Sequence, residues 1–221
     1  MTTQLDPVSQ QFVEAGKSSD STVLDIGAAF GVASLQVLTT GHANVLANDL
    51  EAEHLNQLME NCPQSERHRL LLLPGDLFSL EVKENTVDAI LASRVLHFYK
   101  GSDVIKALGL FKKWLKPGGK LFLVMESPYI RSAEPFVPLF EKRLQEGDKF
   151  PGYIENLRQY ESFVRVDDLP KELHLFTPET IEPLLQEAGF KTLHNDFIDR
   201  KEFPEDLRKD GRESTGVIAL K

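Results

Sequence analysis

One turn between an apolar run and a helical pattern carries the residues best suited to hold a ligand. It reads Val23-Leu24-Asp25-Ile26-Gly27-Ala28-Ala29-Phe30-Gly31. Small residues between a strand and a helix let a ligand approach the backbone closely, at the sheet edge where open α/β folds bind ligands. The plainer alternative is that Gly27 and Gly31 only permit a tight turn.

The charge of this turn indicates which ligand it suits. A dinucleotide fingerprint needs Gly at its first, third and sixth positions, and from Gly27 this chain has Ala29 and Val32 at the latter two. Asp25 would repel a pyrophosphate but attract an ammonium or sulfonium group. S-adenosylmethionine has both of these groups and no phosphate, so it fits better than NAD or NADP.

Two further acids follow apolar runs. Asp49 ends the second run, where a carboxylate can accept two charge-assisted hydrogen bonds from a ribose diol. Asp76 follows the third run after Pro74-Gly75. Asp49 could instead be a solvated loop acid, and Asp76 could form a plain Asx turn.

The elements that would position these residues alternate along the first half of the chain. Nearly continuous apolar runs, typical of strands buried on both faces, are separated by helical patterns, which predicts a parallel sheet with helices on both faces. A turn at 117–119 leads into the fifth strand. The expected strands are 22–26, 44–47, 70–73, 86–92 and 120–126, and the expected helices are 7–15, 31–39, 51–61 and 104–115.

The segment 127–175 breaks this alternation. Its 49 residues contain no convincing core strand, and a structureless loop of that length is uncommon in a compact domain. We therefore expect a helical insertion after the fifth strand, with a helix over 133–146. A helix over 178–188 and two β runs, 191–198 and 215–219, follow it.

The turn that contains Asp25 resembles motif I of the class I, Rossmann-like S-adenosylmethionine-dependent methyltransferases, which usually have Gly where this chain has Ala29. The segments 75–77, 93–97 and 115–121 are similar to later family motifs, and the last two β runs resemble the family's terminal hairpin. The resemblance implies a doubly wound α/β fold with a seven-stranded, mostly parallel sheet and a C-terminal antiparallel hairpin strand. We expect residues 1–221 to form one such domain, with 127–175 as a substrate lid within it.

The resemblance also implies a reaction and a set of contacts. The reaction would be in-line displacement of a methyl group from sulfur, in which the enzyme mainly aligns the acceptor and excludes water. Asp76 would bind the adenine amino group, Leu77 would pack on the ring, and Asp25 and the glycine turn would hold the methionine portion. The expected cofactor contacts are Asp25, Gly27, Ala28, Ala29, Gly31, Asp49, Leu50, Asp76, Leu77, Ser93 and Arg94.

A general base is needed only if the acceptor carries a proton at working pH, as an amine or hydroxyl can. The candidates are His97, Glu126 and Tyr129, with His174 considered beside them. His97 lies just past the fourth strand and Glu126 ends the fifth, so both point toward the expected site. Each could instead be an ordinary helix-start or strand-end residue.

The insertion is where the acceptor would be selected. Its aromatic residues and arginines could form a pocket that clamps a carboxylate or phosphate. Alternatively, the aromatics pack the insertion onto the sheet or onto a second subunit, and the arginines are solvated. These residues are Tyr129, Phe136, Phe140, Phe150, Tyr153, Tyr160 and Phe163, with Arg131, Arg143, Arg158 and Arg165.

Composition bounds the remaining possibilities. A net charge of -9 gives no broad basic field, so a nucleic-acid partner is not expected. Cys62 is the single cysteine and no Cys/His cluster has zinc spacing, so neither an internal disulfide nor a metal site is expected. With no secretory signal and no apolar run long enough for a bilayer, we expect a cytoplasmic protein without membrane contact.

We therefore expect an S-adenosylmethionine-dependent methyltransferase that acts on a small molecule at oxygen, nitrogen or carboxylate, with a homodimer through 127–175 as an option. The alternatives are a nicotinamide-dependent dehydrogenase and a non-catalytic, cofactor-binding interaction protein.

Overall fold

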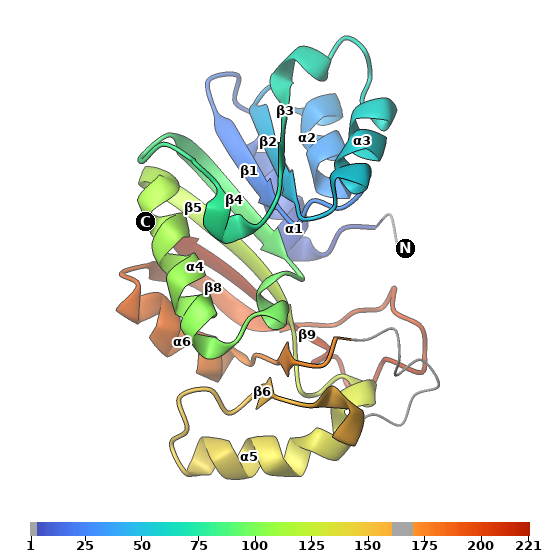
Figure 1. Ribbon diagram of the computed structural model, residues 1–221, viewed down its shortest axis with the longest axis vertical. Helices are drawn as coiled ribbons and strands as arrows, with labels where there is room; N and C mark the ends of the chain where they lie inside the picture. The colour runs from blue at the N-terminus through green and yellow to red at the C-terminus, as the bar shows by residue number, and fades with distance from the viewer. Residues whose placement is uncertain (1–3, 161–169) are drawn as a thin grey trace.

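A seven-stranded sheet forms the centre of the computed structural model, which describes residues 4–160 and 170–221 (Figure 1). Its strands are β1 (Thr22–Ile26), β2 (Asn44–Asp49), β3 (Leu70–Pro74), β4 (Val87–Ser93), β5 (Leu115–Glu126), β8 (Lys191–Ile198) and β9 (Ser214–Leu220). The strand order is β3-β2-β1-β4-β5-β9-β8. Strands β1 to β5 pair in parallel, whereas β9 runs antiparallel to both β5 and β8. The predicted seven-stranded, mostly parallel sheet with one antiparallel strand from the C-terminal hairpin, β9, is confirmed.

Helices cover both faces of this sheet. Helices α1 (Pro7–Ala15), α2 (Val32–Thr40) and α3 (Ala52–Asn61) pack on one face, and α4 (Gly101–Trp114) and α6 (Pro178–Glu187) pack on the other. Successive strand side chains point to opposite faces, so a strand covered on both sides is apolar throughout. No helix in 4–160 or 170–221 combines the length and the apolarity needed to cross a membrane.

In the main sheet and the helices that cover it, two predicted boundaries are wrong by more than two residues. Helix α4 begins at Gly101 because the Lys100 carbonyl already accepts the N–H groups of Asp103 and Val104. The predicted turn at 117–119 lies inside β5, where the pairing with β4 shifts register after Leu115. Pro and Gly mark bulges as well as turns, and the sequence alone does not separate the two.

The insertion after β5 has a small core of its own. It contains a 3₁₀ helix, η4 (Arg131–Phe136), followed by α5 (Val137–Gln145) where one helix was predicted. Pro135 and Pro138 each lack a backbone N–H, which favours this break. A two-stranded sheet of β6 (Tyr153–Ile154) and β7 (Leu173–His174) was not predicted, because two-residue strands show no periodicity. Figure 1 shows the insertion as a layer facing the carboxyl ends of the strands.

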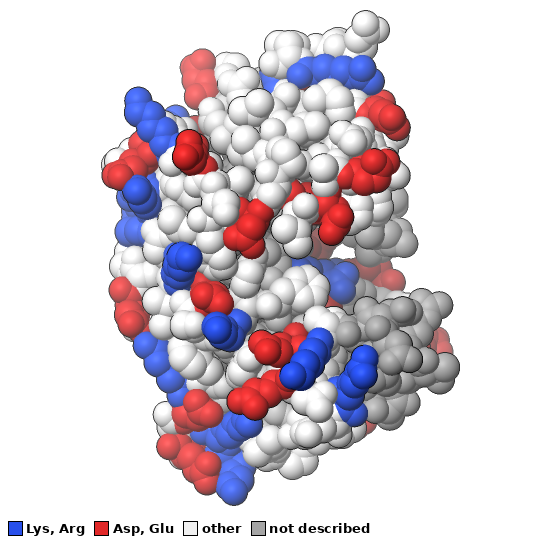
Figure 2. Space-filling view, in the orientation of Figure 1, with Lys and Arg blue, Asp and Glu red and all other residues white. Residues whose placement is uncertain are grey.

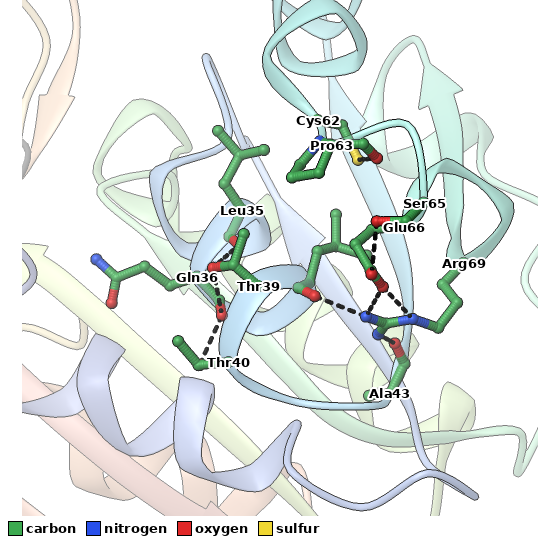
Figure 3. A network of polar contacts seen from close by, with 11 residues as sticks. Leu35, Gln36, Thr39, Thr40, Ala43, Cys62, Pro63, Ser65, Glu66 and Arg69 are labelled. Atoms are coloured by element: carbon green, nitrogen blue, oxygen red, sulfur yellow. Dashed lines mark hydrogen bonds and ion pairs between the residues drawn. The ribbon is translucent and has the colours of Figure 1, made fainter.

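Arg69 joins three segments on the outer side of the sheet (Figure 3). It ends the 3₁₀ helix η1 (Arg67–Arg69), and its guanidinium donates to Ala43 O at 2.7 Å and to Leu38 O at 2.6 Å. Glu66 also binds this guanidinium, with Nε at 3.1 Å from Oε2. The Leu38 carbonyl lies in the last turn of α2, where carbonyls have no partner within the helix.

We expect Arg69→Ala to lower the free energy of unfolding by about 2 kcal/mol, because two backbone carbonyls lose a charged donor. Guanidinium denaturation, followed by the fluorescence of the single tryptophan, Trp114, measures this change. The exposed neighbour His68 provides the control variant His68→Ala. Equal midpoints for the two variants would show that Arg69 does not support the fold.

Candidate functional site

The loop between β1 and α2 contains three residues in the left-handed backbone conformation. They are Gly27 (φ 66°), Ala29 (φ 49°) and Gly31 (φ 76°). A Cβ atom on Gly27 would lie 2.4 Å from Val95 Cγ2, and one on Gly31 would lie 2.2 Å from Leu58 Cδ1. Larger side chains therefore do not fit at either glycine. The loop lies at the carboxyl edge of the sheet, as the sequence predicts.

Ala29 carries the strain of this loop, because a left-handed backbone costs a non-glycine residue about 1–2 kcal/mol. Ala29→Gly removes that strain but adds backbone freedom to the unfolded chain. We expect a net stabilisation of about 0.5 kcal/mol, measured as a higher denaturant midpoint. A lower midpoint would mean that Ala29 is not strained.

Asp25 is the penultimate residue of β1, and it is buried and hydrogen-bonded to α2. It is 3% exposed, and Ser34 Oγ donates to its Oδ2 at 2.7 Å. Burial raises the pKa of Asp25 to about 6, partly opposed by the hydrogen bonds from Ser34. The contact with Ser34 gives Asp25 a structural role, and its role toward a methionine ammonium group stays a prediction.

The raised pKa of Asp25 predicts a pH dependence of stability. The folded-state pKa of about 6 lies above the ordinary 3.8, so the stabilising contribution is full below about pH 4 and is lost as the pH rises through 6. Asp25→Asn should remove this dependence and be more stable than the wild type at neutral pH. Denaturation midpoints measured across this range test it, and parallel curves for both proteins would contradict it.

Asp49, at the end of β2, reaches the loop after β1. Its Oδ2 accepts the Ala29 N–H at 2.8 Å, and its Oδ1 accepts the Glu51 N–H at 3.0 Å and lies 3.1 Å from His54 Nδ1. A carboxylate has about four lone-pair sites, so one remains for a ribose hydroxyl rather than the two predicted. The structure thus brings Asp49 together with the loop.

Asp76 and Leu77 differ in exposure. Asp76 is exposed, and its carboxylate accepts the Phe78 N–H at 2.8 Å as the N-cap of the 3₁₀ helix η2 (Leu77–Ser79). Leu77 is 2% exposed and packs in the core beneath α4, so it has little surface left for an adenine ring. The Asx turn considered for Asp76 is therefore present, and it leaves the predicted adenine contact open.

Arg94, the first residue after β4, is hydrogen-bonded to Glu126, the last residue of β5. Arg94 has φ 60°, and its Nη2 donates to Glu126 Oε1 at 2.7 Å. Burial raises the pKa of Glu126, but His97, Arg94 and Arg200 outweigh it and the net shift is downward. The structure thus joins an ionised carboxylate at the end of β5 to the segment that follows β4. Ser93, half-buried, ends β4 beside Arg94.

His97 lies in the 3₁₀ helix η3 (Leu96–Phe98), close enough to Glu126 for each side chain to shift the pKa of the other. It is 3% exposed, and its Nδ1 has no hydrogen-bond partner in the part of the chain that the structure describes. Burial lowers the pKa of His97, although Glu126 raises it. A neutral imidazole beside an ionised carboxylate can accept a proton.

Large exposed apolar side chains also mark the carboxyl edge. Leu50 follows β2 and is 69% exposed, and Phe98 follows β4 and is 56% exposed. The others in the described chain, Leu71 and Leu193, lie on the outer strands β3 and β8. Figure 2 shows the surface indented between the sheet and the insertion, with acidic side chains above the indentation. Such an edge suits a partly apolar, cationic ligand.

Tyr129 lies in a different environment from His97. Its ring contacts Phe140 and Phe197, and the Arg212 guanidinium carbon lies 3.8 Å from the ring centroid. Burial raises the pKa of Tyr129, which disfavours the phenolate that a base would need. A cavity of about 200 Å³ beside it is lined by Tyr129, Leu144, Thr177, Pro178, Glu179, Phe197 and Arg212.

The insertion residues mostly pack against their own segment. Phe136 and Phe140 are fully buried, and Arg143 donates to Tyr153 O at 2.7 Å. His174 stacks on Phe176, and burial lowers its pKa to about 4. Phe136 and Phe140 thus pack as the packing interpretation expects, whereas Arg143 is hydrogen-bonded to the backbone rather than solvated. Phe163 and Arg165 lie outside the described residues.

Sequence reasoning missed three residues near the site: His54, Arg200 and Glu213. Arg200 is 4% exposed, its Nε donates to Glu202 at 2.6 Å, and its guanidinium lies over the Phe203 ring. Glu213 is 1% exposed, and its carboxylate accepts four backbone N–H groups. A polar stretch gives no periodic signal, and charged residues within it are ordinarily solvated.

Comparison with known proteins shows what the first half of the chain resembles. Residues 23–119 match the model of a family described as a methyltransferase domain. Over 105 residues the chain is 30% identical to the histone-arginine methyltransferase CARMER of Drosophila ananassae. The aligned region covers 47% of this chain and 19% of that protein. The chain thus spans about a fifth of the length of the curated relatives it matches.

Solved structures share the fold. A S-adenosylmethionine-dependent methyltransferase of Mesorhizobium loti matches with a TM-score of 0.66 and 20% identity, covering 97% of this chain and 98% of that one. The 1,6-didemethyltoxoflavin-N1-methyltransferase of Burkholderia thailandensis, with bound 1,6-didemethyltoxoflavin and S-adenosylhomocysteine, matches at 0.65 and 18%, covering 97% and 76%. The matched methyltransferase domain and the sheet topology are consistent with a class I, Rossmann-like S-adenosylmethionine-dependent methyltransferase.

Proposed function

We propose that this protein transfers a methyl group from S-adenosylmethionine to a small molecule bound between the carboxyl edge of the sheet and the insertion 127–175. The observation that carries the proposal is the contact of the Ala29 N–H with Asp49, which joins the left-handed loop to an acid with a free lone-pair site. This arrangement suits a nucleoside without a phosphate. The insertion would act as the lid of a single domain spanning 1–221.

The residues at this edge fit the cofactor. Asp49 would accept a ribose hydroxyl, exposed Leu50 would cover one face of the base, and Asp76 would bind the adenine amino group. Asp25 would favour the cationic methionine end, beside the backbone of Gly27, Ala28, Ala29 and Gly31 and near Ser93 and Arg94. When bound, the cofactor supplies an already activated methyl electrophile.

We assign removal of the acceptor's proton to His97, with Glu126 as its supporting carboxylate. His97 would take a proton from an amine or hydroxyl acceptor, and ionised Glu126 would stabilise the imidazolium that forms. Arg94 holds Glu126 in place through its hydrogen bond. Tyr129 is a weaker candidate because its pKa is raised. A carboxylate acceptor would need none of these groups.

The solved relatives support a small-molecule acceptor. One of these proteins is a 1,6-didemethyltoxoflavin-N1-methyltransferase, and another is the glycopeptide N-methyltransferase MtfA. We also propose a cytoplasmic protein with no nucleic-acid partner, and a homodimer through 127–175. Light scattering coupled to size-exclusion chromatography tests the dimer, and a monomeric mass at micromolar concentration would exclude it.

Calorimetric titration with S-adenosylmethionine, S-adenosylhomocysteine, NAD and NADP tests the cofactor. Binding of NAD but not of the sulfonium ligand would indicate the dehydrogenase alternative. Release of S-adenosylhomocysteine across a panel of amines, phenols and carboxylates then tests catalysis. Binding without turnover on any acceptor would favour the non-catalytic interaction protein.

A further inference from the structure

His54 lies where the two walls of the proposed cofactor site meet. It stands in the first turn of α3, with its Nδ1 3.1 Å from Asp49 Oδ1. Its ring packs edge-on against Phe30, in the loop after β1, with the ring centroids 4.7 Å apart. One imidazole therefore contacts both the loop and the acid that ends β2.

The contact with Asp49 fixes the tautomer of this imidazole. An ionised carboxylate only accepts hydrogen bonds, so Nδ1 must carry a proton whether or not the ring is charged. The other donors to Asp49 among the described residues are the backbone N–H groups of Ala29 and Glu51. His54 is thus the side-chain donor that completes the orientation of the carboxylate.

The exposure of the pair fits a role at the edge of a ligand site. The side chain of His54 is 35% exposed and that of Asp49 is 11% exposed. Water therefore competes for the His54 contact more than for the backbone donors. Without His54, the Asp49 carboxylate keeps the backbone donors of Ala29 and Glu51. It loses the imidazole, which contacts both Asp49 and Phe30.

We propose that His54 is a positioning residue for the cofactor, which orients the Asp49 carboxylate before the ligand binds. This inference rests on the proposed function, since it takes Asp49 to accept the ribose. His54 does not act at the reacting atoms. Its loss should raise KM for the cofactor and leave kcat at saturating cofactor unchanged.

Three variants separate the two contacts of His54. The side-chain amide nitrogen of Asn occupies the position of Nδ1, so His54→Asn keeps the donor to Asp49 without the ring. His54→Phe keeps a ring against Phe30 without the donor, and His54→Ala removes both. In calorimetric titrations with S-adenosylhomocysteine, we expect the Ala and Phe variants to bind about tenfold more weakly and the Asn variant within about threefold of the wild type.

The control is Gln57→Ala, at an exposed position one turn further along α3. Thermal unfolding without ligand identifies any variant that is poorly folded. Wild-type affinity in His54→Ala, or Asn and Ala variants that are equally impaired, would overturn the inference. A wild-type protein that binds neither S-adenosylmethionine nor S-adenosylhomocysteine would overturn the proposed function itself, a result seen before any variant is made.

Discussion

Asp49→Ala should weaken the binding of S-adenosylmethionine more than thirtyfold, or by about 2 kcal/mol. The substitution removes the acceptor proposed for the ribose hydroxyl. It also leaves the Ala29 and Glu51 N–H groups without the carboxylate that holds them at 2.8 and 3.0 Å. The loop after β1 then loses its link to β2, so both the contact and the preorganisation of the site are lost.

Calorimetry measures this loss, and Glu53→Ala, at an exposed position in α3, is the control. Far-UV circular dichroism establishes that both variants are folded. Affinity within about twofold of the wild type would remove Asp49 from the cofactor site, since a lost charge-assisted contact costs more than that. Equal weakening by Glu53→Ala would point to a general charge effect instead.

Glu213→Gln should lower the free energy of unfolding by about 3 kcal/mol. Glu213 Oε1 accepts the N–H groups of Lys209, Asp210 and Gly211 at 2.7–3.1 Å, and Oε2 accepts that of Arg200 at 3.2 Å. A glutamine offers one oxygen and one NH₂ group, so at least one buried N–H would face another donor. The segment between β8 and β9 then loses the anchor that shapes it.

Denaturation followed by Trp114 fluorescence measures this effect, with Glu205→Gln in the same segment as an exposed control. Burial alone would raise the pKa of Glu213, but the backbone donors lower it below the ordinary 4.5. Its contribution is therefore present above about pH 4.5 and is lost as the pH falls through the lowered pKa. A variant with wild-type stability at neutral pH would contradict this account.

Local patterns determined the sheet and its helices. Asp6-Pro7 predicts the start of α1, and in the structure the Asp6 carboxylate accepts the Val8 and Ser9 N–H groups at 2.9 and 3.0 Å. The apolar runs of the parallel strands are equally local, because burial on both faces leaves no polar positions. Errors arose where one residue type serves two structures, as Pro and Gly do in β5 at 117–119.

The candidate site divides in the same way. The sequence indicates the turn from Gly27 to Gly31 and the acid Asp49, because both stand directly at strand ends. It does not indicate that Tyr129 packs against Phe197, or that the backbone of Arg200 binds Glu213. These contacts join segments that differ in sequence character and meet only after the hairpin of β8 and β9 returns to the sheet.

By itself, the sequence determined the alternation of strands and helices, the glycine turn after β1 and the resemblance to a methyltransferase domain. Tertiary structure alone decided which distant side chains meet, such as Arg94 with Glu126, which lie 32 residues apart. Backbone preference and side-chain periodicity act over about ten residues and can be read locally. Contacts between segments that are distant in the sequence depend on how whole helices and strands pack together. A local sequence pattern carries no information about that packing.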